Sequence, residues 1–185
     1  MRLGWPLARL PAKFVWAAYV ALNSFVKIAL LTLLAVLTRT PFVFPSLGPT
    51  AYLFFFSPLA ESASPRNAVP GHTIGLLCGF AAYKATGVHP FPEGFAGDVY
   101  WPRILASALA LSLTGALMVL LHVLHPPAGA TTMIVSLGIL AKPGYLPVIE
   151  IAVVLLATQA FAINRLAGLP YPIWRSQAPP VGGHL

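Results

Sequence analysis

Two short stretches of the sequence share the pattern P-x-x-G-x-T, and both lie within apolar segments. They are residues 45–50 and 126–131. Proline suits the first turn of a helix, where its missing N–H group costs nothing, so Pro49 and Pro127 each predict the start of a short helix. The free N–H groups at such a start, with the positive end of the helix dipole, form an anion site. The alternative is that the prolines only kink helices and the glycines only allow close packing.

Side chains with hydroxyl groups accompany both motifs and would add hydrogen-bond donors for the same anion. The motifs therefore predict a substrate pathway that contains Ser46, Gly48, Thr50, Pro126, Pro127, Gly129, Thr131 and Thr132.

Ionisable residues favour an anionic or neutral cargo. Lys27 lies in the middle of the first long apolar segment, where a charge costs about 3 kcal/mol or more and usually marks function, so we add it to the predicted pathway. The acidic residues all lie in loops or at the start of a segment, and they are Glu61, Glu93, Asp98 and Glu150. A cation or proton antiporter usually requires a carboxylate at mid-membrane.

The histidines allow two interpretations. His72 follows Arg66 and Asn67 in a short polar linker, where Arg66 and His72 would attract or gate the anion. His122 and His125 are spaced i, i+3, so at the end of a helix they would share a face. A haem or metal site formed by His72, His122 and His125 is therefore an alternative, although without a nearby carboxylate or cysteine ligand we favour a capping or interfacial role. We expect no cofactor.

The composition indicates that lipid surrounds the helices that carry these residues. Of 185 residues, 58% are hydrophobic and 8% are charged, whereas a soluble domain has about 25% charged residues. The apolar residues form long blocks, which predicts an all-α, polytopic transmembrane bundle in contact with the bilayer. The net charge of +7 comes from basic residues spread singly around these blocks. This spread is typical of topology signals and argues against a nucleic-acid partner.

Six apolar segments are predicted, at about 14–37, 42–59, 71–85, 104–124, 126–140 and 148–166. We expect the first, third, fourth and sixth to be full spans, and the second and fifth to be short and broken by Pro and Gly.

In the third segment Gly71, Gly75 and Gly79 recur every four residues, which lets another helix approach closely. A single transmembrane domain is expected over residues 1–169, followed by an irregular Pro/Gly-rich tail over 170–185.

The two halves of the chain, about 14–85 and 102–166, have the same order of long helix, broken segment and third helix. This order predicts an internal repeat. If the broken segments cross the membrane there are six spans and the halves are inverted; if they re-enter there are four spans. In both cases the basic residues place the N-terminus in the cytoplasm.

The residues His125-Pro126-Pro127-Ala128-Gly129-Ala130-Thr131 resemble the signature of the HPP family of integral membrane proteins. Elements similar to the family's S-L-G-A-T-A, S-P-L-A, P-R-N and G-G-H stretches lie at residues 46–51, 57–60, 65–67 and 71–72. Two positions depart from the family pattern, with Pro49 in place of alanine and Pro70 in place of glycine. The resemblance implies four transmembrane segments, and it implies nitrite as a candidate cargo because plant and cyanobacterial members are associated with nitrite transport.

These observations predict a membrane transporter or channel for a small anion rather than an enzyme. Nitrite is the first candidate, and the protein would be a homo-oligomer in the cell membrane. The alternatives are the haem- or metal-binding subunit described above and a membrane scaffold without cargo. Passive, proton-coupled and sodium-coupled transport are all compatible with the sequence.

Overall fold

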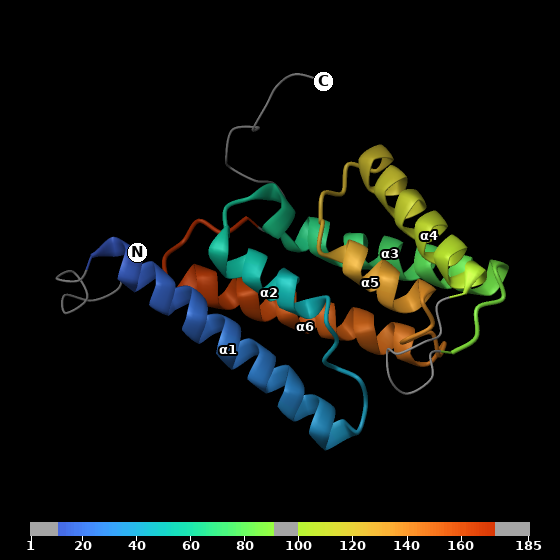
Figure 1. Cartoon of the computed structure of the whole chain (residues 1–185). Coiled ribbons are helices and arrows are strands. Elements are labelled where there is room, and N and C mark those ends of the chain that lie inside the picture. Colours follow the sequence, from blue (N-terminus) through green and yellow to red (C-terminus); the bar gives the residue numbers. More distant parts are fainter. Residues whose placement is uncertain (1–10, 91–99, 173–185) are drawn as a thin grey trace.

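The computed structural model describes residues 11–90 and 100–172, and these residues form helices without any strand (Figure 1). The predicted tail beyond residue 172 lies outside this part. The all-α prediction is confirmed for the described chain. The elements are α1 (Ala12–Thr38), α2 (Leu47–Phe56), the 3₁₀ turn η2 (Glu61–Ala63), α3 (Pro65–Ala85), α4 (Trp101–Leu120), α5 (Ala128–Ser136) and α6 (Tyr145–Leu166).

Three of the described helices, α1, α4 and α6, are long and apolar enough to cross a membrane. Helix α3 has 21 residues but carries the polar side chains of Arg66, Asn67, His72 and Thr73. The short helices α2 and α5 have 10 and 9 residues, and at 1.5 Å per residue each spans about half of the ~30 Å hydrocarbon layer. Four full spans are therefore not confirmed.

Helix α3 begins six residues earlier than the apolar pattern predicted. Pro65 occupies its first turn, a position that favours proline, and Pro70 lies inside the helix. The short polar linker predicted between the second and third apolar segments thus folds into η2 and the start of α3. Proline at position 70 removes one helical hydrogen bond to the Arg66 carbonyl and leaves the helix continuous.

Helix α4 ends earlier than predicted, and the expected pairing of His122 with His125 on one helix face is wrong. His122 has a left-handed φ of 52°. The N–H of Val123 bonds the Met118 carbonyl and that of His122 bonds the Val119 carbonyl, which is a Schellman helix end. The chain therefore changes direction here, and His122 is exposed whereas His125 is buried.

Helix α3 packs most closely on α5 through its glycine stripe. A Cβ atom at Gly75 would lie 2.8 Å from the Ala128 carbonyl oxygen, and one at Gly79 would lie 2.8 Å from that of Thr132. At Gly71 it would lie 2.8 Å from the Cβ of His125. The stripe was predicted to let another helix approach closely, and α5 is that helix.

The two short helices leave the interior of the bundle toward opposite ends. Helix α2 ends beside the start of α1, where residues 57–60 line a hollow with Trp16. Helix α5 ends beside the start of α4, where Arg103 bonds the Leu137 carbonyl. Helices α2 and α5 begin beside each other, so their N-terminal ends overlap in the middle of the bundle (Figure 1).

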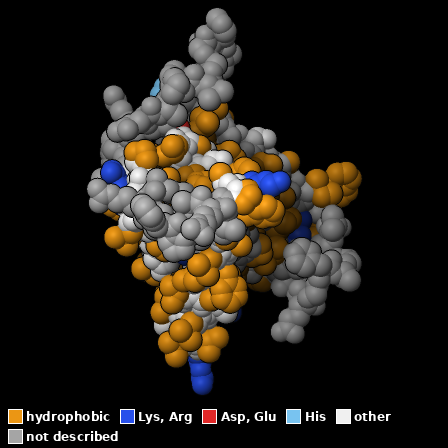
Figure 2. All heavy atoms as spheres, turned by 90° about the vertical axis from the view of Figure 1, so that its left-hand side faces the viewer, with side chains coloured by type: hydrophobic (Ala, Val, Ile, Leu, Met, Phe, Trp, Pro, Cys, Tyr) orange, Lys and Arg blue, Asp and Glu red, His pale blue; other side chains and the backbone are white. Residues whose placement is uncertain are grey.

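The surface of the bundle is apolar and its interior holds polar side chains. Figure 2 shows one face, on which apolar side chains cover most of the described surface and the Lys and Arg side chains are isolated. Large apolar side chains such as Phe25 and Val119 are 72% and 68% exposed. This distribution suits a lipid environment, because buried polar groups must then find partners inside the protein. The polar side chains buried at 1% exposure or less are Lys27, Ser46, Thr50, Ser64, Asn67, His72, Arg103, Thr114, His125, Thr131, Thr132, Ser136 and Asn164.

Candidate functional site

The N-terminal ends of α2 and α5 are joined by hydrogen bonds between their hydroxyl groups and a histidine. Ser46 Oγ, at the N-cap of α2, lies 2.6 Å from Thr131 Oγ1 in the first turn of α5. Thr50 Oγ1, one turn further along α2, lies 3.4 Å from Nε2 of His125, which precedes α5. Because residues 46 and 50 meet residues 131 and 125, the two segments run past each other in opposite directions.

His72 of α3 connects both short helices. Its Nδ1 lies 2.7 Å from Thr131 Oγ1 and its Nε2 lies 3.0 Å from Thr50 Oγ1. The His72 and His125 rings have their centroids 5.0 Å apart. We call Ser46, Thr50, His72, His125 and Thr131 the His72 cluster. Three elements that are far apart in the sequence therefore share one buried hydrogen-bonded network.

The tautomers of both histidines follow from their partners when the imidazoles are neutral. His125 Nδ1 must carry a proton because its partner, 2.8 Å away, is the Ser62 carbonyl oxygen. His125 Nε2 is then an acceptor for the Thr50 hydroxyl, which also lies 3.0 Å from the Ser46 carbonyl oxygen. Since the Thr50 hydroxyl donates its one hydrogen to the Ser46 carbonyl oxygen, the nearer of the two acceptors, its own oxygen accepts from His72 Nε2, which carries the proton of His72.

The first N–H groups of both short helices already have backbone partners, which differs from the predicted anion site. Gly48 N donates to the Pro45 carbonyl, and Gly129 N donates to the Pro126 carbonyl. These turns satisfy donors that we expected to be free for a ligand. The positive ends of both helix dipoles still overlap at the His72 cluster, because the dipoles come from the aligned peptide groups of each helix.

Two buried side chains satisfy the carbonyl groups at the other ends of the short helices. Asn164 of α6 donates from Nδ2 to the Phe54 carbonyl at 3.0 Å, and its Oδ1 accepts from the Tyr19 hydroxyl at 2.8 Å. Arg103 of α4 donates to the Leu137 carbonyl at 3.1 Å. A helix end buried in a membrane protein needs such partners. Sequence reasoning missed Asn164, whose signal is a polar side chain inside an apolar segment.

Arg103 is one of the singly spread basic residues whose pattern is typical of topology signals, but its side chain is buried inside the bundle. Its side chain is 1% exposed, and beyond Leu137 it bonds the carbonyls of His89 and Pro90 at 3.0 and 3.3 Å. A basic residue at a helix C-terminus also matches the negative end of the dipole. Arg103 therefore holds α5 and the chain after α3 together.

Lys27 is buried as expected but lies outside the His72 cluster. Its Nζ is 3.3 Å from the Leu156 carbonyl oxygen of α6 and 5.1 Å from the centroid of the Phe55 ring. The ammonium group therefore joins α1 to α2 and α6. No described carboxylate pairs with it.

Three other predicted pathway residues also have partners elsewhere or remain apart. Thr132 Oγ1 lies 3.0 Å from Thr114 Oγ1 of α4, away from His72. Asn67 donates to the Glu61 carbonyl at 2.9 Å and so holds η2 against α3. Arg66 is half-buried in the first turn of α3 and makes no hydrogen bond to any residue that the structure describes.

The alternative histidine set for a metal or haem is not brought together. His122 is exposed at the end of α4, and the ring nitrogens of the buried pair already face Thr50, Thr131 and Ser62. Within residues 11–90 and 100–172, no three His, Cys, Asp or Glu side chains form a metal-binding group.

An open hollow of about 440 Å³ lies between the starts of the two short helices. Ser62, whose carbonyl accepts from His125, is one of its lining residues. No residue of the His72 cluster lines the hollow, so the hydrogen bond from His125 to Ser62 is the link between its wall and the cluster. Its walls are mainly apolar and consist of Pro49, Tyr52, Leu53, Ser62, Pro126, Pro127 and Ala130.

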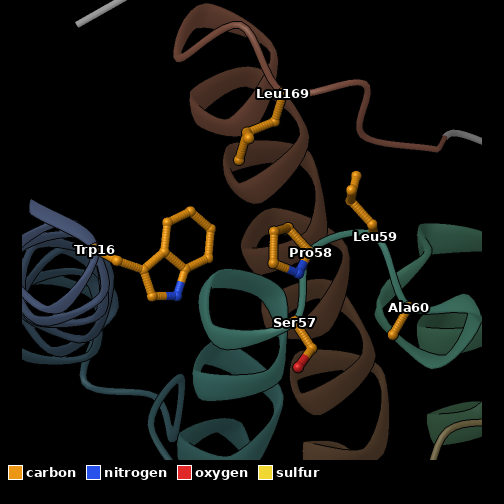
Figure 3. A pocket seen from close by; sticks show the side chains of 6 residues that line it. All are labelled: Trp16, Ser57, Pro58, Leu59, Ala60 and Leu169. Carbon is orange, nitrogen blue, oxygen red and sulfur yellow. The ribbon is translucent and has the colours of Figure 1, made fainter. Parts of the chain in front are cut away.

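A second hollow of about 330 Å³ lies at the end of the bundle where α1 begins (Figure 3). Trp16, Ser57, Pro58, Leu59, Ala60 and Leu169 line it, and none of them belongs to the His72 cluster. Nearby, the buried Tyr171 hydroxyl donates to the Ala63 carbonyl, and burial raises the pKa of this phenol, so it keeps its proton. The second hollow is an apolar surface feature at the bundle end.

Comparisons with known proteins place the whole described bundle in one family. Residues 10–172 match the transmembrane region of the HPP family. A transmembrane protein of Dictyostelium discoideum is 28% identical over 136 residues, which cover 70% of this chain and 44% of that protein. A second transmembrane protein of Dictyostelium discoideum is 32% identical over 117 residues, 61% of this chain and 34% of that protein.

The chain thus spans less than half the length of either curated relative. No solved structure matches it. The family match covers both short helices, α3 and every residue of the His72 cluster, and on this ground the chain belongs to the HPP transmembrane family.

Proposed function

We propose that the protein transports a small anion across the cell membrane, with nitrite as the first candidate. The observation that carries the proposal is the meeting of two half-length helices at one buried polar cluster, where Ser46 bonds Thr131 and His72 bonds both helices. Helices that break inside a membrane place their dipole ends and polar groups where a transporter binds its substrate. Overlapping positive ends favour an anion there.

The charges around the cluster agree with an anionic cargo. No described acidic side chain hydrogen-bonds a residue of the His72 cluster, so no fixed negative charge opposes an anion. The open hollow at Ser62 offers an approach to the cluster. Nitrite is chosen because the HPPAGAT resemblance implies it, and nothing in the cluster demands a larger substrate.

We also propose that both broken segments cross the membrane, which gives six crossings. After α1 the chain passes inward without helix over residues 39–46 and continues as α2 to the end where α1 began. After α4 it repeats this path through residues 121–127 and α5, toward the opposite end. Each half then has three crossings, and the halves form an inverted repeat of the kind found in secondary transporters.

The basic residues remain compatible with a cytoplasmic N-terminus in the six-crossing arrangement. Arg66 then lies on the same side as the N-terminus, and Arg39, Lys84 and Lys142 lie on the other. Arg103 no longer counts as a topology signal, because it is buried. The exposed mouth of the hollow between α2 and α5 would be enclosed by a second copy of the chain, so we propose a homo-oligomer.

Nitrite uptake into proteoliposomes tests the proposed transport. The isosteric Thr131→Val variant removes a hydroxyl that bonds both Ser46 and His72, and we expect uptake to fall at least about tenfold because buried polar groups lose their partner. Thr158→Val is the matched control, since Thr158 is exposed and its hydroxyl bonds the Val154 carbonyl of its own helix. It should leave uptake unchanged.

The result that would overturn this proposal is nitrite uptake no faster than in empty vesicles, with no competition among nitrite, nitrate and formate. Equal uptake by the wild type and Thr131→Val would instead remove the His72 cluster from the pathway and favour a scaffold role for the HPP turn.

A further inference from the structure

The hydrogen bonds of the His72 cluster have one consistent direction when both imidazoles are neutral. His72 Nε2 donates to Thr50, as shown above, so His72 Nδ1 is an acceptor. The Thr131 hydroxyl, 2.7 Å away, donates to it. The Thr131 oxygen in turn accepts from the Ser46 hydroxyl at 2.6 Å. Every hydrogen in this chain then has an acceptor, the donors point from Ser46 through Thr131 and His72 to Thr50, and the Thr50 hydroxyl donates to the Ser46 carbonyl oxygen.

The opposite tautomer of His72 satisfies the cluster less well. If Nδ1 carried the proton, the Thr131 hydroxyl would donate to Ser46 Oγ, and the Ser46 hydroxyl would have no acceptor among the described residues. The Thr50 hydroxyl would turn to His72 Nε2 and give up its hydrogen bond to the Ser46 carbonyl oxygen. An unpaired buried polar group costs about 1–3 kcal/mol. The first arrangement is therefore the resting one.

We propose that His72 binds one proton together with each transported anion, so that the protein is a proton–anion symporter. The inference rests on the proposed anion transport. A hydronium ion breaks one O–H bond and gives its proton to His72 Nδ1, where an N–H bond forms, and the neutral water that remains keeps the electron pair of the broken bond. The Thr131 hydroxyl then turns its hydrogen toward Ser46 Oγ. No other covalent bond changes.

Protonation of His72 prepares the cluster for the anion in two ways. The imidazolium supplies a positive charge inside the apolar bundle, where charge attraction is stronger than in water. The Ser46 hydroxyl loses Thr131 as its acceptor and donates to the anion instead. Proton and anion each favour the binding of the other, and such coupling is reciprocal.

The two histidine rings have no charged hydrogen-bond partner among the described residues. His125 faces His72 directly, and no acidic or basic side chain that the structure describes hydrogen-bonds either ring. The charged groups on the neighbouring elements have other partners or surroundings. Glu150 of α6 accepts from Thr73, Glu61 of η2 is exposed, Lys27 of α1 contacts Leu156 and Phe55, and Arg66 is half-buried at the start of α3.

Nitrogen NMR of ¹⁵N-histidine-labelled protein in liposomes tests the proton site directly. At neutral pH we expect the proton of His72 on Nε2 and that of His125 on Nδ1. At a fixed acidic pH, saturating nitrite should raise the ratio of protonated to neutral His72 about tenfold, within the usual range of binding couplings. His122, which is exposed, is the internal control and should not respond.

A variant separates coupling from simple protonation. In Ser46→Ala the proton site of His72 remains, but the hydroxyl that joins it to the anion is gone, so nitrite should no longer change the protonated fraction. Ser107→Ala on α4 is the matched control, because the Ser107 hydroxyl bonds the Ile104 carbonyl of its own helix. It should respond to nitrite as the wild type does.

Transport measurements on the same vesicles distinguish this inference from the proposed function. Symport of one proton with one anion moves no net charge, so an inward pH gradient should accelerate nitrite uptake and a potassium diffusion potential should not. Uptake by empty vesicles is subtracted to remove permeation of nitrous acid. Protein-dependent uptake that follows the membrane potential and ignores the pH gradient overturns the symport and leaves anion transport standing. Absence of protein-dependent uptake overturns both.

Discussion

At the scale of single residues, the protein solves a problem that lipid imposes on every buried polar group. Ser46, Thr50, His72, His125 and Thr131 satisfy one another, and each is at most 1% exposed. Lys27 has fewer partners, since its ammonium group contacts one carbonyl oxygen at 3.3 Å and an aromatic ring but no described carboxylate. The charge of Lys27 therefore contributes little to the stability of the fold, whereas its long stem fills space between helices.

Replacement of Lys27 separates the charge from the stem. We expect Lys27→Met to keep or raise the thermal unfolding temperature in detergent, because it removes a buried charge without unpairing a carboxylate. Lys27→Ala should be less stable than Lys27→Met by about 2–4 kcal/mol, because it leaves a cavity. If both variants are equally destabilised, the charge itself holds α1 in place.

At the scale of the elements, two contacts position α5, one with α3 and one with α4. One is the glycine stripe of α3, which allows the backbone of α5 to approach. The other is Arg103, which satisfies the carbonyl end of α5. Both follow from the short length of α5, because a 9-residue helix inside the bundle has two ends to satisfy and little area to pack.

The glycine contact predicts a steric effect. In Gly75→Ala the new Cβ would lie 2.8 Å from the Ala128 carbonyl oxygen and 2.9 Å from Thr132 Oγ1, so α5 must move and stability should fall by about 1–3 kcal/mol. Gly115→Ala on α4 is the control, since nothing lies within 4 Å of its new Cβ. Helix propensity should make this variant about 1 kcal/mol more stable. Thermal unfolding of both variants in one detergent measures the difference.

The Arg103 contact predicts a loss of several hydrogen bonds in one substitution. Arg103→Met leaves the carbonyls of Leu137, His89 and Pro90 without this donor, and stability should fall by about 3 kcal/mol or more. Arg165→Met, at the exposed end of α6, should change stability by about 0.5 kcal/mol or less. An equal effect of the two substitutions in chemical unfolding would show that Arg103 only marks topology.

At the scale of the whole molecule, the path of the broken segments decides which loops share a side of the membrane. In the six-crossing arrangement η2 and the chain around His122 lie on the side of the N-terminus, and the loops at Arg39 and Lys142 lie on the other. With re-entrant segments and four spans, η2 and the chain around His122 would move to the opposite side. The overlap of α2 and α5 inside the bundle favours the first arrangement.

Cysteine labelling distinguishes these arrangements. In a Cys78→Ser background, which removes the one native cysteine, a buried one, we expect Glu61→Cys and His122→Cys to react with an impermeant maleimide from the side of the N-terminus. Arg39→Cys and Lys142→Cys should react from the opposite side. All four positions are exposed. Labelling of Glu61→Cys and Arg39→Cys from the same side would establish re-entrant segments.

The sequence by itself determined the membrane class, the helical fold and the two broken segments. It also indicated the buried position of Lys27, because composition, block length and proline position act locally. The sequence did not predict where α4 ends, because His122 adopts a left-handed backbone conformation that the histidine residue type does not signal. The sequence also did not predict that α3 begins at Pro65, because tertiary packing stabilises as helix the polar residues that local hydropathy assigns to a linker.

Only the tertiary structure decided which polar groups meet. The sequence placed Thr131 and Thr132 together, yet their side chains point to His72 and to Thr114, because neighbours on a helix face different directions. Along the sequence His72 is distant from both motifs, whereas in the fold α3 places His72 between them. The direction of the hydrogen bonds from Ser46 to Thr50 depends on contacts between segments up to 85 residues apart, and no local pattern encodes that path.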